Sequence, residues 1–128
     1  MASILRVNTL TDASSNNSTA MSTINQGTAK AWVNFNGQGT IAARDSFNVA
    51  SLTDNGDGDY TITFSNNMGN ANYIINGTGE QLSSNDSVVV NKDYSTAYTT
   101  SAARIAVTQG STRTNPVYAN FSNHGDLA

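Results

Sequence analysis

The sequence predicts an all-β chain, in which an antiparallel, jelly-roll-like β-sandwich follows an extended N-terminal segment. Three observations predict this fold. Apolar and polar residues alternate in several short runs, and turn signals rich in Gly, Asn and Asp separate these runs at roughly 8–12 residue intervals. Helical periodicity is nearly absent, since Asn25 and Gly27 argue against the one weak helical stretch, Ser22 to Lys30. We therefore divide the chain into an N-terminal anchor or linker, residues 1–28, and a β-sandwich domain, residues 29–128.

The N-terminal segment begins with one short strand and continues without periodicity. Residues 3–10 alternate loosely and carry β-branched side chains, which favours a strand. Between Thr11 and Lys30, Met21 and Ile24 are the only sizeable apolar side chains. Such a stretch cannot bury enough surface to offset its ordering entropy alone. We expect a linker, or a segment that neighbouring chains put in order.

Short apolar runs predict the strands of the domain in order. These runs lie at residues 31–35, 41–43, 47–51, 60–64, 73–75, 88–90, 94–99, 104–108 and 117–121. The run that begins at Tyr60 shows the clearest alternation. Asn36-Gly37 and the cluster Asp54 to Asp59 are turn signals, because Gly and Asn tolerate a positive φ. Pro116 fits the entrance to the last strand, where its missing N–H costs little.

Composition and charge exclude several classes of protein. Charged residues make up 12% of the chain, about half of the roughly 25% usual in soluble proteins. Their place is taken by 49 Asn, Ser and Thr residues. The six Lys and Arg residues are scattered among nine acids, so we expect no nucleic-acid partner. The sequence has no apolar run of about 18 residues, which predicts no insertion into a membrane.

The predicted core is thin for a domain of this length. Large apolar side chains are few, the chain has no cysteine for disulfides, and no metal site is evident. Oligomerisation is the remaining common source of stability in such domains, and a closed assembly would also protect the edges of the sheet. We therefore expect a homo-oligomer.

The acidic turn is a candidate cation site. A calcium loop needs acids at alternate positions, but Gly56 and Gly58 occupy positions three and five counted from Asp54. We interpret the cluster as a hairpin turn, with an ion held between Asp57 and Asp59 as the alternative.

The remaining titratable residues do not predict catalysis. His124, the single histidine, lies near the C-terminus in a tail that we expect to be flexible, although Asp126 is close to it. Three copies of His124 around a threefold axis are an alternative metal site. Glu80 is the only glutamate, and no pair of acids has the arrangement that glycoside cleavage needs. We expect no catalytic residue, no resident metal, no cofactor and no enzymatic activity.

Aromatic residues supply the candidate binding surface. Trp32 and Tyr60 are expected in the core or in an interface, because aromatic residues in strands usually pack there. Tyr94 and Tyr98 lie in a polar stretch and are better placed for exposed contacts. We predict that these two tyrosines contact a receptor.

Several segments together resemble a module found in bacteriophage tail-fibre and other virion structural proteins, which is common in phages of cyanobacteria and marine bacteria. The resemblance is carried by AKAWVNFNG at residues 29–37, GTIA at 39–42, RDSFNV at 44–49, TDNG at 53–56, GDYT at 58–61 and NANY at 70–73. Residues 5–12, LRVNTLTD, look like the leader that often precedes the module. The resemblance is good over residues 29–80 and weak beyond residue 81.

This resemblance implies a non-enzymatic virion component, located in the tail or a surface appendage, that assembles as a homotrimer. Its N-terminal segment would contact other virion proteins through the apolar side chains of Ile4, Leu5, Val7 and Leu10. Its β domain would face outward and contact a host-surface glycan or protein. A capsid-surface fibre or decoration protein, a stand-alone carbohydrate-binding module and a small hydrolase are the alternatives.

Overall fold

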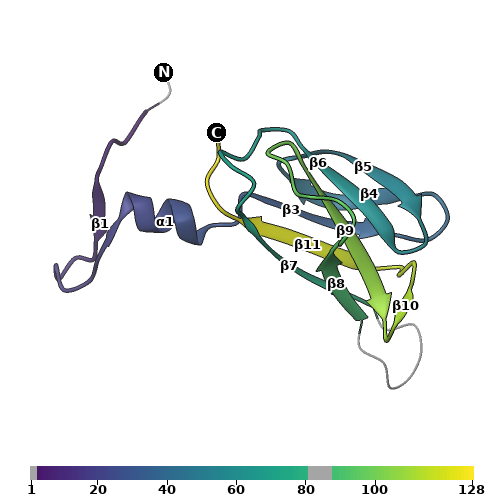
Figure 1. Cartoon of the computed structure of the whole chain (residues 1–128). Helices are drawn as coiled ribbons and strands as arrows, with labels where there is room; N and C mark the ends of the chain where they lie inside the picture. Colours follow the sequence, from purple (N-terminus) through teal and green to yellow (C-terminus); the bar gives the residue numbers. More distant parts are fainter. Residues whose placement is uncertain (1–2, 81–87) are drawn as a thin grey trace.

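The computed structural model describes residues 3–80 and 88–128, which form an N-terminal arm and a β-barrel-like domain (Figure 1). The arm contains three short elements: β1 (Thr9–Thr11), β2 (Ser18–Ala20) and α1 (Met21–Gly27). The domain contains nine strands: β3 (Ala31–Asn36), β4 (Ala42–Phe47), β5 (Val49–Gly56), β6 (Asp59–Phe64), β7 (Ile74–Gly79), β8 (Val88–Lys92), β9 (Ala102–Gln109), β10 (Thr112–Arg113) and β11 (Ala119–His124).

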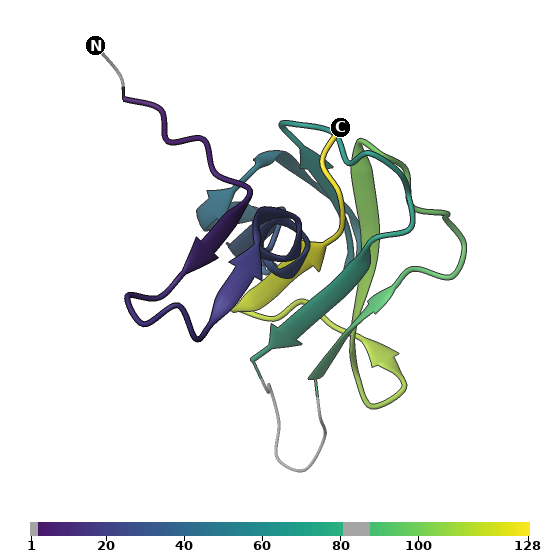
Figure 2. The same cartoon turned by 90° about the vertical axis from the view of Figure 1, so that its left-hand side faces the viewer.

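The nine strands of the domain belong to one antiparallel sheet. Eight of them follow the order β4-β3-β11-β7-β8-β9-β6-β5, and β10 pairs with β9. The two edge strands, β4 and β5, are consecutive in the chain, so the sheet curls into a nearly closed barrel, and Figure 2 shows its strands arranged in a ring. The predicted antiparallel all-β fold is confirmed. The division into two packed sheets, as in a jelly-roll sandwich, is not confirmed, because the hydrogen bonding is continuous from edge to edge.

Asn48 holds the sheet together near its two edges. This residue separates β4 from β5 and has a φ of 56°, a conformation that Asn tolerates better than most residues. Its side-chain amide donates to the backbone oxygen of Lys30 at 2.9 Å and to that of Asn66 at 3.1 Å. Its side-chain oxygen accepts from the N–H of Asn66 at 2.6 Å. The predicted run 47–51 is therefore two strands with a bend between them.

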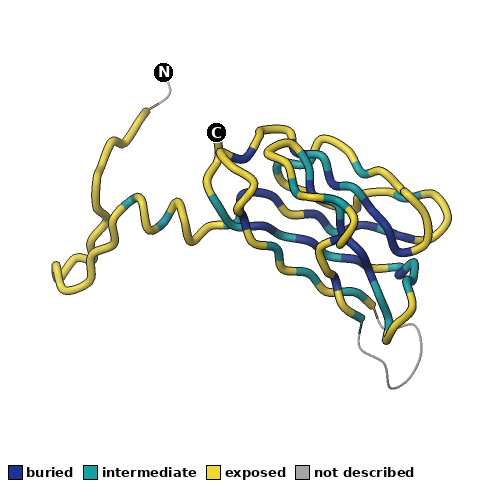
Figure 3. Tube along the Cα trace, viewed as in Figure 1, coloured by how far each residue is buried: buried dark blue, intermediate teal, exposed yellow. Residues whose placement is uncertain are grey.

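The core fills the interior of the barrel mainly with alternate residues of β3, β6, β9 and β11, as the buried positions in Figure 3 show. Val33 and Phe35 of β3 are buried, as are Ile62 and Phe64 of β6. Both alternations that the sequence shows most clearly are thus confirmed. Trp32 is different: it lies on the outer face of β3, so of its two expected positions, core or interface, the core is excluded.

Tyr60 organises the end of the core that is farther from the arm. Its ring meets that of Phe35 edge to face, with centroids 5.0 Å apart. Its hydroxyl lies 2.7 Å from Oδ1 of Asn115 and 3.0 Å from the backbone oxygen of Gly37. A Cβ at position 37 would lie 2.5 Å from this hydroxyl, which is why the loop after β3 needs glycine here.

The arm has more regular structure than its sequence predicts. The strand predicted at residues 3–10 is confined to β1, which pairs with β2 around a turn. Asp12 holds this turn, because its carboxylate accepts from the N–H of Asn16 at 3.0 Å and from the side-chain amide of Asn17 at 2.7 Å. These hydrogen bonds, that from the Asn17 side chain first, lower the pKa of Asp12.

Helix α1 was disfavoured by the sequence and forms because both of its ends are held. The N–H of Met21 donates to the backbone oxygen of Asn8 at 2.9 Å, which ties the helix start to the arm hairpin. At the other end the ammonium group of Lys30 donates to the backbone oxygen of Asn25 and to the hydroxyl of Thr28. These bonds satisfy polar groups that a seven-residue helix leaves free at its end.

The remaining differences lie in the second half of the domain. Residues 94–99 form turns and bends rather than the predicted strand, and β10 was not predicted. The strand predicted at residues 117–121 starts two residues later, after Pro116, whose backbone oxygen accepts from the N–H of Gly37 at 2.9 Å.

Candidate functional site

The outer face of β3, β11 and β7 carries a groove of about 560 Å³. Every residue that lines it is uncharged. The lining consists of Trp32, Val33, Asn34, Asn76, Gly77, Thr78, Asn120, Phe121 and Ser122. We call it the β3–β11–β7 groove. Because side chains alternate between the two faces of a strand, the even-numbered residues of this set point outward and the odd-numbered ones belong to the floor.

Strand register arranges the outward side chains in two rows across the groove. In the first row Trp32 of β3 pairs with Ser122 of β11, which pairs with Asn76 of β7. In the second row Asn34 pairs with Asn120, which pairs with Thr78. Side chains directly opposite each other in an antiparallel pair lie close enough to interact, so each row forms a continuous strip of side chains.

The second row is a ladder of hydrogen bonds. Nδ2 of Asn34 donates to Oδ1 of Asn120 at 2.5 Å, and Nδ2 of Asn120 donates to the hydroxyl of Thr78 at 3.1 Å. Asn120 is therefore fixed from both sides. The ladder leaves one further N–H on each amide, Oδ1 of Asn34 and the hydroxyl proton of Thr78 available to a ligand.

The first row continues beyond the groove as a pair of aromatic side chains. Trp32 pairs with Phe47 of β4. Trp32 is 37% exposed and Phe47 is 50% exposed. These two paired side chains, which we call the aromatic platform, place exposed aromatic surface beside the polar ladder.

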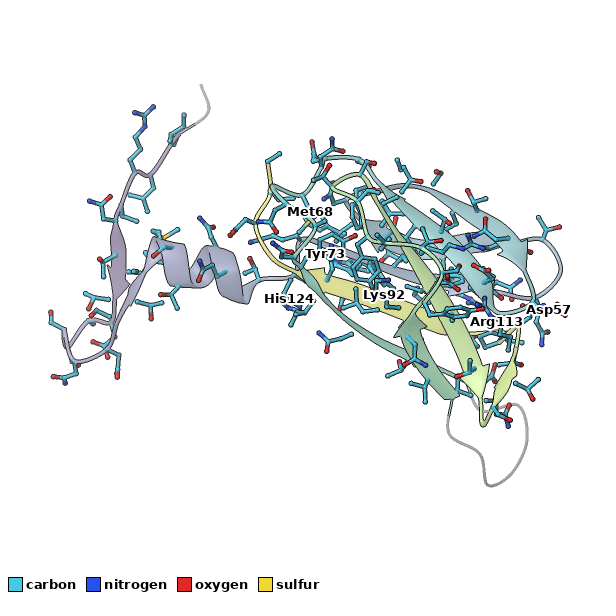
Figure 4. All side chains as sticks on the ribbon, in the orientation of Figure 1. Asp57, Met68, Tyr73, Lys92, Arg113 and His124 are labelled. Atoms are coloured by element: carbon cyan, nitrogen blue, oxygen red, sulfur yellow. The ribbon has the colours of Figure 1, made fainter. Side chains whose placement is uncertain are left out.

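The two tyrosines predicted to contact a receptor lie in different environments. Tyr94 is 91% exposed and stands free of the core. Tyr98 is half-buried: its ring stacks on Tyr73 with centroids 5.0 Å apart, and Nζ of Lys92 lies 5.3 Å from its ring centroid. Figure 4 shows Lys92 and Tyr73 in the same part of the domain. Burial raises the pKa of Tyr98 to about 12. The structure thus does not join these tyrosines into one exposed surface.

The acidic turn is part of an ion-pair network on the outer face of β6 and β9. Arg104 donates two hydrogen bonds, of 2.8 and 2.7 Å, to the carboxylate of Asp59. Nη1 of Arg113 lies 2.9 Å from the same carboxylate. The hydrogen bonds from Arg104 lower the pKa of Asp59, and the charge of Arg113 adds to the effect. Because two guanidinium groups occupy Asp59, its carboxylate is not free to coordinate a cation.

The other acids of this region also have partners. Oδ1 of Asp57 accepts from the side-chain amide of Asn115 at 2.9 Å, and Asp57 and Arg113 lie at the end of the domain remote from the arm (Figure 4). Asp93 is buried, and it accepts from the hydroxyl of Ser95 and, at 2.5 Å, from Nη2 of Arg113. The Ser95 hydroxyl and the Arg113 guanidinium lower the pKa of Asp93 to about 2. The acidic turn is therefore a hairpin that ion pairs with arginine stabilise.

His124 is the last residue of β11, where it pairs with Ile74, so it does not lie in a flexible tail as expected. Its Nδ1 is buried without a hydrogen-bond partner. Within residues 3–80 and 88–128, no three His, Asp or Glu side chains gather so as to hold a metal ion. Glu80, the single glutamate, is exposed.

The predicted anchor residues lie on the arm and are open to solvent. Leu5 is 80% exposed, and Ile4, Val7 and Leu10 are exposed as well. Figure 3 shows exposed residues along nearly the whole arm, and none of residues 3–28 is buried. The domain therefore does not cover these apolar side chains.

Comparisons with protein-family models, with curated proteins and with solved structures find no match to this chain. The resemblance to virion structural modules therefore rests on the motif residues and stays a prediction. In the part of the chain that the structure describes, no helix has the length and apolar character that crossing a membrane requires.

Proposed function

We propose that the chain is a non-enzymatic virion structural protein: a homotrimeric tail-fibre or appendage subunit, anchored by its N-terminal arm. The observation that carries the proposal is the arm itself, which extends from the domain (Figure 1). Its large apolar side chains are exposed. Its β domain serves host-surface adsorption.

The arm lacks a core of its own. A two-stranded hairpin and a seven-residue helix are both marginal in water when they stand alone. Burying Ile4, Leu5 and Leu10 against another protein would contribute roughly 1.5–3 kcal/mol for each side chain that becomes fully buried. Sister arms or a particle surface are the partners that supply such burial.

The sequence resemblance supports the same role, and most of its residues lie outside the arm. Its best-matching part, residues 29–80, lies in the domain, and its leader, residues 5–12, lies in the arm. A capsid-surface fibre or decoration protein would use the same arm and differs only in where it attaches. A stand-alone carbohydrate-binding module is the second candidate, and the β3–β11–β7 groove is the observation that favours it.

Light scattering on the full chain tests the assembly. We expect a particle of three times the 13.4 kDa subunit mass, and we expect Leu5→Ser combined with Leu10→Ser to weaken it. Tyr94→Ser is the control, because it removes a large exposed side chain from the domain rather than from the arm. A wild-type chain that stays monomeric at every concentration would contradict the proposal.

Detection in purified particles separates the two candidate functions. A virion subunit must copurify with phage particles through a density gradient at a fixed copy number. A stand-alone carbohydrate-binding module would instead remain in the soluble fraction.

A further inference from the structure

We propose that the β3–β11–β7 groove is a binding site for neutral saccharides. This inference rests on the proposed adsorption role and deepens it, because it assigns a ligand class and a location to the outward-facing surface. The groove is separate from Tyr94 and Tyr98, which the sequence favours. Three features of the groove point to this ligand class: the polar ladder, the aromatic platform and the shape of the groove.

The polar ladder fits hydroxyl groups. A sugar hydroxyl both donates and accepts, so it is best matched by groups that offer both functions. Asn34 and Asn120 are held by the ladder, with hydrogen bonds of 2.5 and 3.1 Å, and still offer N–H groups and a carbonyl oxygen. Asn76 and Ser122 add an amide and a hydroxyl in the neighbouring row. Since the ladder already fixes two amides, binding costs little side-chain entropy.

The aromatic platform fits the apolar face of a sugar ring. A pyranose presents C–H groups on one face and hydroxyls around its rim. Trp32 and Phe47, paired across β3 and β4, offer an exposed aromatic surface to such C–H groups. Ser122 and Asn76 continue the row of Trp32 and so meet the hydroxyl rim of a sugar that stacks on the indole.

The charge and shape of the groove select the class of saccharide. No lining residue carries a charge, so nothing in the groove would neutralise a carboxylate or sulfate group on a sugar. Its volume of about 560 Å³ falls within the roughly 300–1,000 Å³ range of small-molecule sites. Assembly into a trimer would place several grooves on one particle, so that weak single sites gain avidity on a glycan-covered surface.

The arm of a second copy is the rival occupant of the groove. Its large apolar side chains are gathered near its start, as at Ile4 and Leu5, and these would cover the aromatic platform without offering polar partners to the amide ladder. A saccharide satisfies both parts of the groove. The chemistry therefore favours the saccharide.

Trp32 is the only tryptophan of the chain, so its fluorescence reports on the groove alone. The full-length protein is titrated with neutral tetrasaccharides built from glucose, galactose or mannose, and with a tetrasaccharide of uronic acids. We expect at least one neutral probe to give a saturable change in emission and to protect Trp32 from acrylamide quenching. We expect no change with the uronic acid probe.

Variants then locate the site. Asn120→Ala should weaken binding about tenfold, because it removes the centre of the ladder, and Thr78→Val should weaken it less. Trp32→Ala, followed by calorimetry in place of fluorescence, should abolish binding. Tyr94→Ala tests the rival contact that the sequence favours, and it should bind as the wild type does because Tyr94 does not line the groove. Thermal unfolding of each variant checks that it folds.

Three results would overturn the inference. One is that no neutral probe changes the emission of Trp32 or binds by calorimetry. Another is that Tyr94→Ala loses binding while Asn120→Ala and Trp32→Ala keep it. The third is an emission that changes with protein concentration but not with sugar, which would assign the groove to the arm of a second copy. A trimer that binds no sugar contradicts only this inference, whereas a sugar-binding monomer contradicts only the proposed function.

Discussion

Removing the hydroxyl of Tyr60 tests how the end of the barrel is closed. Tyr60→Phe keeps the buried ring and its edge-to-face contact with Phe35, so it creates no cavity. It removes one hydroxyl that lies 2.7 Å from Oδ1 of Asn115 and 3.0 Å from the backbone oxygen of Gly37. Asn115 keeps a second donor, the N–H of Gly58 at 2.7 Å, so mainly the Gly37 oxygen loses a partner.

The expected cost is therefore that of one hydrogen bond with partial loss of a second, about 1–2 kcal/mol of the free energy of unfolding. For a domain of this size, each kcal/mol of lost stability lowers the melting temperature by at most about 4–8 °C. Urea unfolding followed by far-UV circular dichroism measures it. Tyr118→Phe is the control, because Tyr118 is exposed and should change stability by less than about 0.5 kcal/mol. Equal effects of the two substitutions, or no effect of Tyr60→Phe, would refute the reasoning.

Three further predictions follow from buried groups. Burial raises the pKa of Tyr60 to about 12, so its hydroxyl ionises at a lower pH in the unfolded chain than in the folded one, and stability should fall as the pH rises from about 10 to 12. Tyr60→Phe should flatten this part of a plot of the urea midpoint of unfolding against pH. The pKa of Asp93 is lowered to about 2, so the stabilisation that its ionised carboxylate gives the folded state is present above about pH 4 and should be lost as the pH falls toward 2. An Asp93→Asn chain whose stability depends on acid pH in the same way as that of the wild type would contradict this. Gly77→Val would place a Cβ 2.5 Å from that of Val90 and should cost about 1–3 kcal/mol, measured by thermal unfolding, while Gly27→Ala meets no atom within 4 Å and should be neutral.

β3 and β6 could be predicted from sequence because alternation alone determines them. Val33 and Phe35 point inward, as their spacing predicts, and so do Tyr60 and Phe64. Closure of the barrel could not be predicted in this way. It depends on which strand pairs with which, and β3 pairs with β11, whose residues come more than eighty positions later. Local patterns contain no information on such pairing.

Prediction of the site fails for the same reason. Trp32, Asn34 and Asn120 are ordinary strand residues in sequence, and only the register joins them into rows. The sequence does contain one signal, the position of Trp32 in the alternation of its strand. Trp32 lies between the inward residues Ala31 and Val33, so its side chain must point outward. The general tendency of aromatic residues to pack in cores outweighed that local pattern.

The arm illustrates the opposite error. Its composition predicts little structure, and side-chain hydrogen bonds of Asp12 and Lys30 nevertheless give it a turn and a helix. Polar networks of this kind are invisible to hydrophobic periodicity. The low content of charged residues is reflected in the groove, which is lined by amides, hydroxyls and apolar groups alone.

A density map of the assembled particle tests the central proposal most directly, because it shows what residues 3–28 contact. We expect Ile4, Leu5 and Leu10 to be buried against sister arms or another virion protein, with three domains grouped outside and each β3–β11–β7 groove open to solvent. A particle in which the arm stays free while the domain makes the attachment, or purified particles without the chain, would contradict the proposal.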